Sequence, residues 1–182
     1  MGAHDSVGRS QDGLRIRAAR PGDEALVLEF VRELAEYERL SHEVVATEAD
    51  LAQALFGQPR RAEVLLADFD GRPAGFALFF FTYSTFAGKA GLYLEDLFVR
   101  PEYRGQGVGV GLLRQLAVVA GERGCARMEW VVLDWNQPAI DFYERLGARS
   151  MGDWKTYRLE AAALASLAAA GTAAPPEPGG AN

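Results

Sequence analysis

The sequence predicts a mixed α/β domain in which a mostly antiparallel sheet carries helices on both faces. Strand-like runs and amphipathic helical stretches follow one another in the order β-α-α-β-β-β-α-β-α-β. A strand-helix-strand unit normally makes a parallel crossover and a tight turn makes an antiparallel pair, so this order predicts a mixed sheet. Of the 182 residues, 49% are hydrophobic and 24% are charged, which is ordinary for one globular domain with a substantial core.

The first strand and the first helix are expected close to the N-terminus. LRIR at 14–17 alternates like a short strand. Pro-Gly-Asp at 21–23 then opens a stretch in which the apolar residues from Leu26 to Tyr37 recur at helical spacing. The chain therefore begins with a strand followed by a helix.

Two further helices have recognisable ends. Thr47 and Asp50 have the spacing of a capping box ahead of a short helix, and Gly57 is placed to stop it. Asn136 is a candidate N-cap for a later helix, and Gly147 is placed as its C-terminal stop.

A β-hairpin is expected in the middle of the chain. AEVLLADF (62–69) and PAGFALFFFT (73–82) are strand-like runs joined across Asp70-Gly71. Both residues of this dipeptide tolerate positive φ, which the tight hairpin turn needs. The two strands should therefore be antiparallel neighbours.

The second half of the chain supplies the remaining elements. GLYLEDLFV (91–99) is predicted as a strand, followed by a helix over about 107–122, a strand over 128–134, a helix over 137–146 and a final strand over 151–159.

The folded domain is expected to cover residues 14–160. Residues 1–13 are polar and should form a disordered tail. The Ala/Pro/Gly-rich segment 161–182 is predicted to be a C-terminal tail, disordered from residue 171 onward.

Composition excludes several classes of function. A formal net charge of -6 argues against a nucleic-acid partner and allows a cationic one. Cys125 is the sole cysteine, so a disulfide framework and a multi-cysteine zinc site are excluded, and the isolated His4 and His42 give no reason to expect a metal. No apolar run approaches the roughly 20 residues of a membrane helix, so we expect a cytoplasmic protein without a membrane partner.

The adjacent carboxylates Glu95 and Asp96 interrupt an otherwise apolar strand. A buried carboxylate needs a partner, so the pair is either an exposed or salt-bridged surface feature or a part of the site. Strict alternation places the two side chains on opposite faces, and only a bulge or a splayed strand would let both serve one pocket. If the strand is regular, the sequence favours Glu95 as the functional carboxylate.

A Gly-rich turn, PEYRGQGVGVG (101–111), lies between this strand and the next helix. Such a turn can direct backbone N–H groups at a phosphate, and the helix N-terminus adds a favourable dipole. The other interpretation is a tightly packed turn without a ligand. No Gly-Lys-Ser/Thr follows, which argues against a nucleoside-triphosphate loop, and Arg104 can add charge to a bound pyrophosphate.

The turn resembles the acetyl-coenzyme-A loop of the GNAT superfamily of N-acetyltransferases, with RGQGVG at 104–109 in the place of the motif. Three further stretches are similar to the spermidine/spermine (diamine) and thialysine acetyltransferases: ELAEYE (33–38), FTYSTFAGKAGLYLEDLFV (81–99) and WNQPAIDFYERLGA (135–148). The resemblance covers about residues 14–160. It implies the GNAT fold, with six to seven strands splayed at the cofactor site.

The resemblance also implies an activity. It implies direct transfer of acetyl from acetyl-CoA to a primary amine of a small cationic molecule in a ternary complex, in a homodimer. The alternatives are a protein or peptide N-acetyltransferase, and a non-catalytic acyl-CoA-binding module on the same fold.

Site residues follow from the resemblance residue by residue. The catalytic residues are Tyr143, as the acid that protonates the leaving thiolate, and Glu95, as the base. From the residues alone, a core tyrosine is the favoured interpretation of Tyr143. The substrate-binding residues are Tyr37, Glu38, Phe86, Glu95, Asp96 and Glu129, with Phe86 standing where the polyamine enzymes have Trp. The cofactor-binding residues are Leu97, Phe98, Val99, Arg104, Gly105, Gln106, Gly107, Val108, Gly109, Val110, Asn136, Gln137, Pro138, Ala139 and Tyr143.

Overall fold

The computed structural model describes residues 13–170, so the predicted disordered stretches 1–12 and 171–182 lie outside the described residues. The chain divides into two compact units, the first ending at Val131 and the second beginning at Val132. The elements of the first unit are β1 (Leu14–Ala18), α1 (Glu24–Tyr37), η1 (Ser41–Glu43), α2 (Glu48–Phe56), β2 (Glu63–Phe69), β3 (Arg72–Ser84), β4 (Lys89–Val99), η2 (Pro101–Tyr103), α3 (Val108–Glu122) and β5 (Met128–Glu129). Those of the second unit are α4 (Gln137–Arg145) and α5 (Ala161–Ala170).

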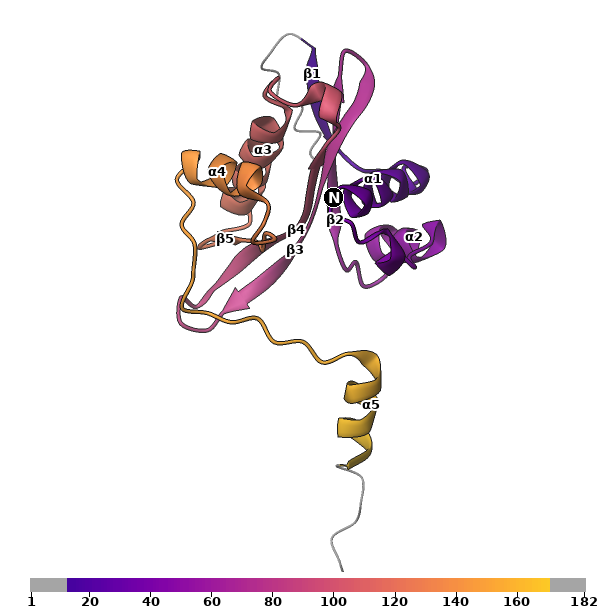
Figure 1. Cartoon of the computed structure of the whole chain (residues 1–182), viewed down its shortest axis with the longest axis vertical. Helices are drawn as coiled ribbons and strands as arrows, with labels where there is room; N and C mark the ends of the chain where they lie inside the picture. Colours follow the sequence, from indigo (N-terminus) through magenta and orange to yellow (C-terminus); the bar gives the residue numbers. More distant parts are fainter. Residues whose placement is uncertain (1–12, 171–182) are drawn as a thin grey trace, which may run out of the picture. The chain divides into compact units, whose positions relative to one another are not determined.

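The first unit is built on a five-stranded sheet with the strand order β1-β2-β3-β4-β5. The first four strands pair antiparallel, and β5 pairs parallel to β4 after the α3 crossover. Helices α1 and α2 lie on one face of the sheet and α3 lies on the other, as Figure 1 shows. The predicted mixed, mostly antiparallel sheet with helices on both faces is confirmed.

The core has one layer on each side of the sheet. On the side of α1 and α2, the Phe30 ring stacks on Phe76 at 5.4 Å between centroids, and Phe98 packs beside them. Leu112 and Leu116 of α3 are fully buried. Each aromatic side chain buried in this way removes a large apolar surface from water, so α1 is held firmly against β3 and β4.

The predicted turn and helix ends are present in the structure. Asp70 and Gly71 both have positive φ, 51° and 74°, in the two-residue turn between β2 and β3. Thr47 and Asp50 form the full capping box of α2, with the Asp50 N–H donating to Thr47 Oγ1 and the Thr47 N–H donating to Asp50. Asn136 caps α4 by accepting the Ala139 N–H at 3.4 Å.

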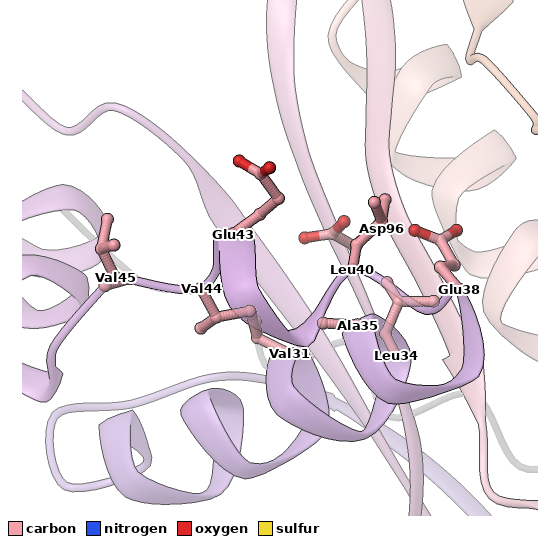
Figure 2. Close-up of a pocket in the computed structure, with 10 residues that line it drawn as sticks. Val31, Leu34, Ala35, Glu38, Leu40, Glu43, Val44, Val45 and Asp96 are labelled. Carbon is pink, nitrogen blue, oxygen red and sulfur yellow. The ribbon is translucent and has the colours of Figure 1, made fainter.

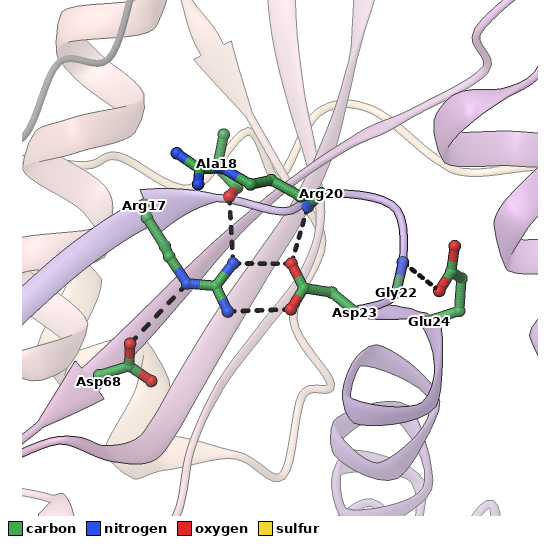
Figure 3. A network of polar contacts seen from close by, with 7 residues as sticks. All are labelled: Arg17, Ala18, Arg20, Gly22, Asp23, Glu24 and Asp68. Atoms are coloured by element: carbon green, nitrogen blue, oxygen red, sulfur yellow. Dashed lines mark hydrogen bonds and ion pairs between the residues drawn. The ribbon is translucent and has the colours of Figure 1, made fainter.

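A polar network ties β1 to the start of α1 (Figure 3). The Arg17 guanidinium donates two hydrogen bonds to the Asp23 carboxylate, at 2.7 and 2.9 Å, and lies 3.9 Å from Asp68. The Arg20 N–H donates to the same Asp23 carboxylate. The hydrogen bonds from Arg17, with that from the Arg20 N–H added, hold the pKa of the Asp23 carboxyl below its usual range. The network fixes the direction in which α1 leaves the sheet.

The strand count and two strand lengths differ from the prediction. Within residues 13–170 the sheet has five strands, rather than six to seven. The strand predicted over 128–134 pairs only at Met128 and Glu129, because β4 bulges just beyond the residues that they pair with.

The segment predicted as a final strand, 151–159, forms no strand: residues 152–153 form a turn, and the other residues are exposed and have no regular secondary structure. Trp154 and Tyr157 are 75% and 89% exposed. An alternating pattern forms a strand only where a partner satisfies its backbone groups, so alternation alone does not make this segment a strand. Residues 161–170, expected to belong to the tail, form the helix α5.

Candidate active site

Strand β4 carries a bulge at the two adjacent carboxylates. Leu78 of β3 pairs with Asp96 while the next residue, Phe79, pairs with Leu94, so Glu95 is the extra residue on β4. A bulge of this kind leaves one residue outside the ladder and bends the strand. The sequence left open whether this strand is regular at Glu95 and Asp96, and in the structure it is not.

The bulge brings both carboxylates to the face of the sheet that α1 covers. Directly paired residues of antiparallel strands point to the same face, and Leu78, the partner of Asp96, packs against the core on the α1 side. Tyr93 pairs with Phe80, which is on the same face as Leu78, and Glu95 follows Tyr93 at the two-residue repeat. Glu95 and Asp96 thus share a face although they are adjacent in the chain.

Asp96 lies in a pocket of about 280 Å³ formed by β4, the end of α1 and the segment that follows α1 (Figure 2). Ten residues line it: Val31, Leu34, Ala35, Glu38, Leu40, Glu43, Val44, Val45, Ala46 and Asp96. The wall is mostly apolar, and two of its carboxylates, Glu38 and Asp96, are half-buried, whereas Glu43 is exposed. The pocket has the character of a site for a cation attached to an apolar chain.

Burial raises the pKa of Asp96 to about 7, and the negative charges of Glu95 and Glu38 add to the effect. Burial also raises the pKa of Glu38. A carboxyl group with a pKa near neutral pH can hold or release a proton under working conditions, as a general acid or base must.

Tyr93 and Glu129 lie next to Glu95 and continue the same face of the sheet to its edge at β5. Tyr93 pairs with Glu129 of β5, and burial together with the charges of Glu95 and Glu129 raises the pKa of the Tyr93 phenol. Glu129 also forms an ion pair with Arg127 at 2.7 Å. The structure therefore gathers four of the predicted substrate-side acids, Glu38, Glu95, Asp96 and Glu129, along one face.

The predicted cofactor turn connects the end of β4 to α3. Gly105 and Gly107 have φ values of 76° and 85°, which an L-residue rarely adopts, and Gly107 is the N-cap of α3. The first turn of α3 contains no acidic residue. The free N–H groups and the dipole of this helix N-terminus suit a negatively charged group such as a pyrophosphate.

The other predicted cofactor residues are distributed over the two units. Leu97, Phe98 and Val99 form the end of β4 beyond the bulge, and Phe98 is buried in the core. Asn136–Ala139 open α4, and Tyr143 lies further along this helix with its ring 5.3 Å from that of Phe142.

Two of the predicted positions have surroundings that the sequence did not anticipate. The Arg104 guanidinium stacks on the Tyr37 ring at 4.8 Å, and its Nε donates to the Val99 carbonyl at 2.9 Å. Phe86 lies in the turn between β3 and β4 and is 99% exposed. Within the first unit, the structure therefore brings Tyr37 and Arg104 together.

Sequence reasoning missed the wall of the pocket that follows α1. The sequence indicates no role for residues 40–46, yet Leu40, Glu43 and Val44 line the pocket. The signal was present in the two adjacent valines at 44–45, which are unusual in an exposed loop. It also missed Tyr93, which the period-two pattern places beside Glu95.

Two features are absent from the described residues, 13–170. No group of three or more His, Cys, Asp or Glu side chains in this part of the chain is arranged to hold a metal ion. None of its helices is long and apolar enough to span a membrane.

A mixed sheet with a bulged strand beside a glycine-rich turn defines an N-acetyltransferase fold, and comparison with known proteins identifies the family. Residues 27–148 match the Acetyltransferase (GNAT) family, so the chain belongs to this family and is an N-acetyltransferase. Members of the family use acetyl-CoA as co-substrate.

Individual relatives support the same family. The chain is 41% identical over 164 residues to the thialysine N-epsilon-acetyltransferase of Sus scrofa, which covers 84% of this chain and 96% of that protein. It is 34% identical over 198 residues to the L-ornithine N5-acetyltransferase of Arabidopsis thaliana, covering 84% and 87% of the two chains. The structure of an integron cassette protein from V. cholerae superposes with a TM-score of 0.72 at 28% identity, over 86% of this chain and 98% of that chain.

Proposed function

We propose that this protein transfers acetyl from acetyl-CoA to a primary amine of a small cationic molecule, a diamine, a polyamine or a thialysine-like amino acid. The observation that carries the proposal is the β4 bulge, which turns Glu95 and Asp96 to one face beside an apolar pocket. The names of the relatives, which act on thialysine and on ornithine, support the same class of substrate.

The acidic face serves first to attract the amine. A lysine-type amine has a pKa near 10.4, so only on the order of one molecule in a thousand is neutral and nucleophilic near neutral pH. Glu95 is exposed and Asp96 and Glu38 are half-buried, so an ammonium meets a carboxylate at the surface before it reaches the pocket. Opposite charge at short range is the strongest recognition that these residues offer.

The same carboxylates serve next to remove a proton. Glu95 is the base that the sequence favours, and it acts through water because it is exposed. Asp96, with a pKa of about 7, is suited to the second position in this relay. An adjacent ammonium favours the ionised form of a carboxyl, so arrival of the substrate lowers the pKa of Asp96 and frees it to accept a proton.

The residues that would hold acetyl-CoA fit their role. The turn from Gly105 to Val110 and the N-terminus of α3 would hold the pyrophosphate, since no acidic residue in the first turn opposes it. The backbone of Leu97–Val99 lies beyond the point where β5 stops pairing with β4, and would contact the pantetheine arm. Asn136–Ala139 would contact the far part of the acetyl-CoA molecule. Acetyl-CoA supplies the acetyl group as a thioester.

Tyr143 is proposed as the proton donor to the leaving sulfur. The leaving thiolate, whose conjugate thiol has a pKa near that of cysteine, is a weaker base than a phenolate, yet a phenol held beside the sulfur can donate its proton as the C–S bond breaks. No nucleophilic cysteine is needed, because the amine attacks directly in a ternary complex. A homodimer and a cytoplasmic location are proposed on the resemblance and on composition.

Acetylation of an amine panel tests the proposal. The purified protein is incubated with acetyl-CoA and with putrescine, spermidine, thialysine, ornithine, lysine or a short peptide, and both free thiol and acetylated product are measured. We expect product with at least one small diamine or basic amino acid and little with the peptide. Product only with the peptide supports a protein or peptide acetyltransferase. Acetyl-CoA binding by calorimetry without any product supports a non-catalytic binding module.

A further inference from the structure

Arg104 is the first residue of the RGQGVG motif in the glycine-rich turn, but its side chain lies against the end of α1. The guanidinium carbon is 4.8 Å from the centroid of the Tyr37 ring and 5.7 Å from that of Phe98. The Nε group donates a hydrogen bond to the Val99 carbonyl at 2.9 Å. Two aromatic rings and a backbone carbonyl thus fix one side chain.

These partners suit a guanidinium better than any other cation. Arginine is planar, stacks on aromatic faces and donates from Nε in a fixed direction, whereas lysine carries a point charge on a flexible chain. Phe98 is itself packed on Phe30 of α1, with the ring centroids 6.5 Å apart. The Arg104 side chain therefore bridges β4 and the last turn of α1.

Tyr37 lies directly before the pocket wall in the chain. It is the last residue of α1, and the helix ends in a tight reversal in which Arg39 has a φ of 63° and the Leu40 N–H donates to the Ala35 carbonyl at 2.8 Å. The residues on either side of Arg39, Glu38 and Leu40, both line the pocket that contains Asp96. Tyr37 is thus directly followed in the chain by a residue of this wall.

We propose that Arg104 is a positioning residue for the acceptor pocket, which ties the first residue of the cofactor turn to Tyr37 and so fixes Glu38 opposite Asp96. The inference rests on the proposed function for the identity of the pocket. In this role Arg104, a residue of the glycine-rich turn, holds the turn and the wall of the amine pocket in fixed positions relative to each other.

Four variants test this role. Arg104→Gln removes the charge and the stacked guanidinium, Arg104→Lys keeps the charge but loses the planar stack, and Tyr37→Leu removes the ring. Arg123→Gln is the matched control, because Arg123 stacks on Phe81 at 5.0 Å at the far end of α3. Circular dichroism and thermal unfolding establish that each variant is folded.

Two measurements are made on each variant. Amide hydrogen exchange over residues 34–40 is expected to become at least fivefold faster in both Arg104 variants and in Tyr37→Leu, and to be unchanged in the control. With the best amine of the panel, the amine KM is expected to rise at least fivefold in the same three variants. The acetyl-CoA Kd of Arg104→Lys is expected to stay within twofold of wild type.

The outcomes separate this inference from the proposed function. The inference would be overturned if exchange over residues 34–40 and the amine KM were unchanged, while the acetyl-CoA Kd rose strongly in Arg104→Gln and stayed near the wild-type value in Arg104→Lys. Arg104 would then act on the phosphates alone. If the wild-type protein acetylates no amine, the proposed function fails, and the exchange rates still decide whether Arg104 positions the end of α1.

Discussion

Asp96 should make the folded protein less stable as the pH rises, and Asp96→Asn should remove that loss. The pKa of Asp96 is about 7 in the folded protein, whereas the ordinary value is 3.8. Between these two values the folded protein keeps the Asp96 proton and the unfolded chain has lost it, so the free energy of unfolding falls as the pH rises. The stabilising contribution is complete below the lower value and is lost as the pH rises through about 7.

The size of the effect follows from the two pKa values. One pKa unit corresponds to about 1.4 kcal/mol, so the full difference is about 4 kcal/mol, and the part that falls between pH 5 and pH 8 is about 2.5 kcal/mol. Asparagine has nearly the same shape and no titratable proton. The wild-type protein should therefore lose about 2.5 kcal/mol relative to Asp96→Asn over this range.

Urea unfolding of both proteins at pH 5, 6, 7 and 8 measures this difference, because the titration of all other groups cancels in the comparison. Asp153→Asn is the matched control, since Asp153 is exposed and lies outside the pocket. A difference between wild type and Asp96→Asn that stays constant from pH 5 to pH 8 would refute the assignment of a raised pKa to Asp96. The pocket would then be well hydrated.

Three further changes have definite expected results. Tyr143→Phe should lower kcat about 100-fold with little change in the acetyl-CoA Kd, because it removes the proposed acid, and unchanged turnover across the pH range would remove Tyr143 from the mechanism. Gly107→Ala should cost about 1–3 kcal/mol of stability and weaken acetyl-CoA binding measured by calorimetry, because residue 107 has a φ of 85°. Gly121→Ala, in the same helix without a positive φ or a close neighbour, is its control and should be neutral or stabilising. Thr47→Ala should cost about 1 kcal/mol in urea unfolding and leave kcat/KM unchanged, and equal stability would show that the α2 capping box contributes nothing.

The parts of the fold that depend on short-range chemistry could be predicted from the sequence. The Asp70-Gly71 turn and the Thr47–Asp50 capping box need only the residues that form them, and both are present. The predicted crossover is also present, because β4, α3 and β5 follow one another with little choice of connection. Local signals of this kind do not depend on distant partners.

The errors concern features that depend on partners distant in the sequence. The segment 151–159 alternates like a strand but forms none, because pairing depends on a partner strand that the segment's own sequence does not specify. Periodicity predicts the conformation of a segment and leaves its neighbour undetermined. The same limit explains why six to seven strands were expected and five are found in the described residues.

The site residues stay predictions, and only part of the geometry around them could be predicted from the sequence. Glu95 and Asp96 stand out in the sequence as two adjacent acids in an apolar strand. The sequence indicates that both can serve one pocket only if the strand bulges or splays. The bulge itself depends on how β4 pairs with β3, which a single strand does not reveal. The stacking of Arg104 on Tyr37 joins residues that are 67 positions apart, beyond the range of any local pattern.

The central claim is that the carboxylates turned to one face by the bulge remove the proton from a cationic amine, and the pH dependence of kcat/KM tests it most directly. The measurement compares the wild-type protein with Asp96→Asn and Glu95→Gln, using the best amine of the panel at saturating acetyl-CoA. The account predicts that wild-type kcat/KM rises to a plateau with an apparent pKa near 7, and that this limb is shifted or lost in Asp96→Asn. A kcat/KM that continues to rise in all three proteins up to the amine's own pKa, near 10, would contradict it, because the enzyme would then be using only amine that had already lost its proton in solution.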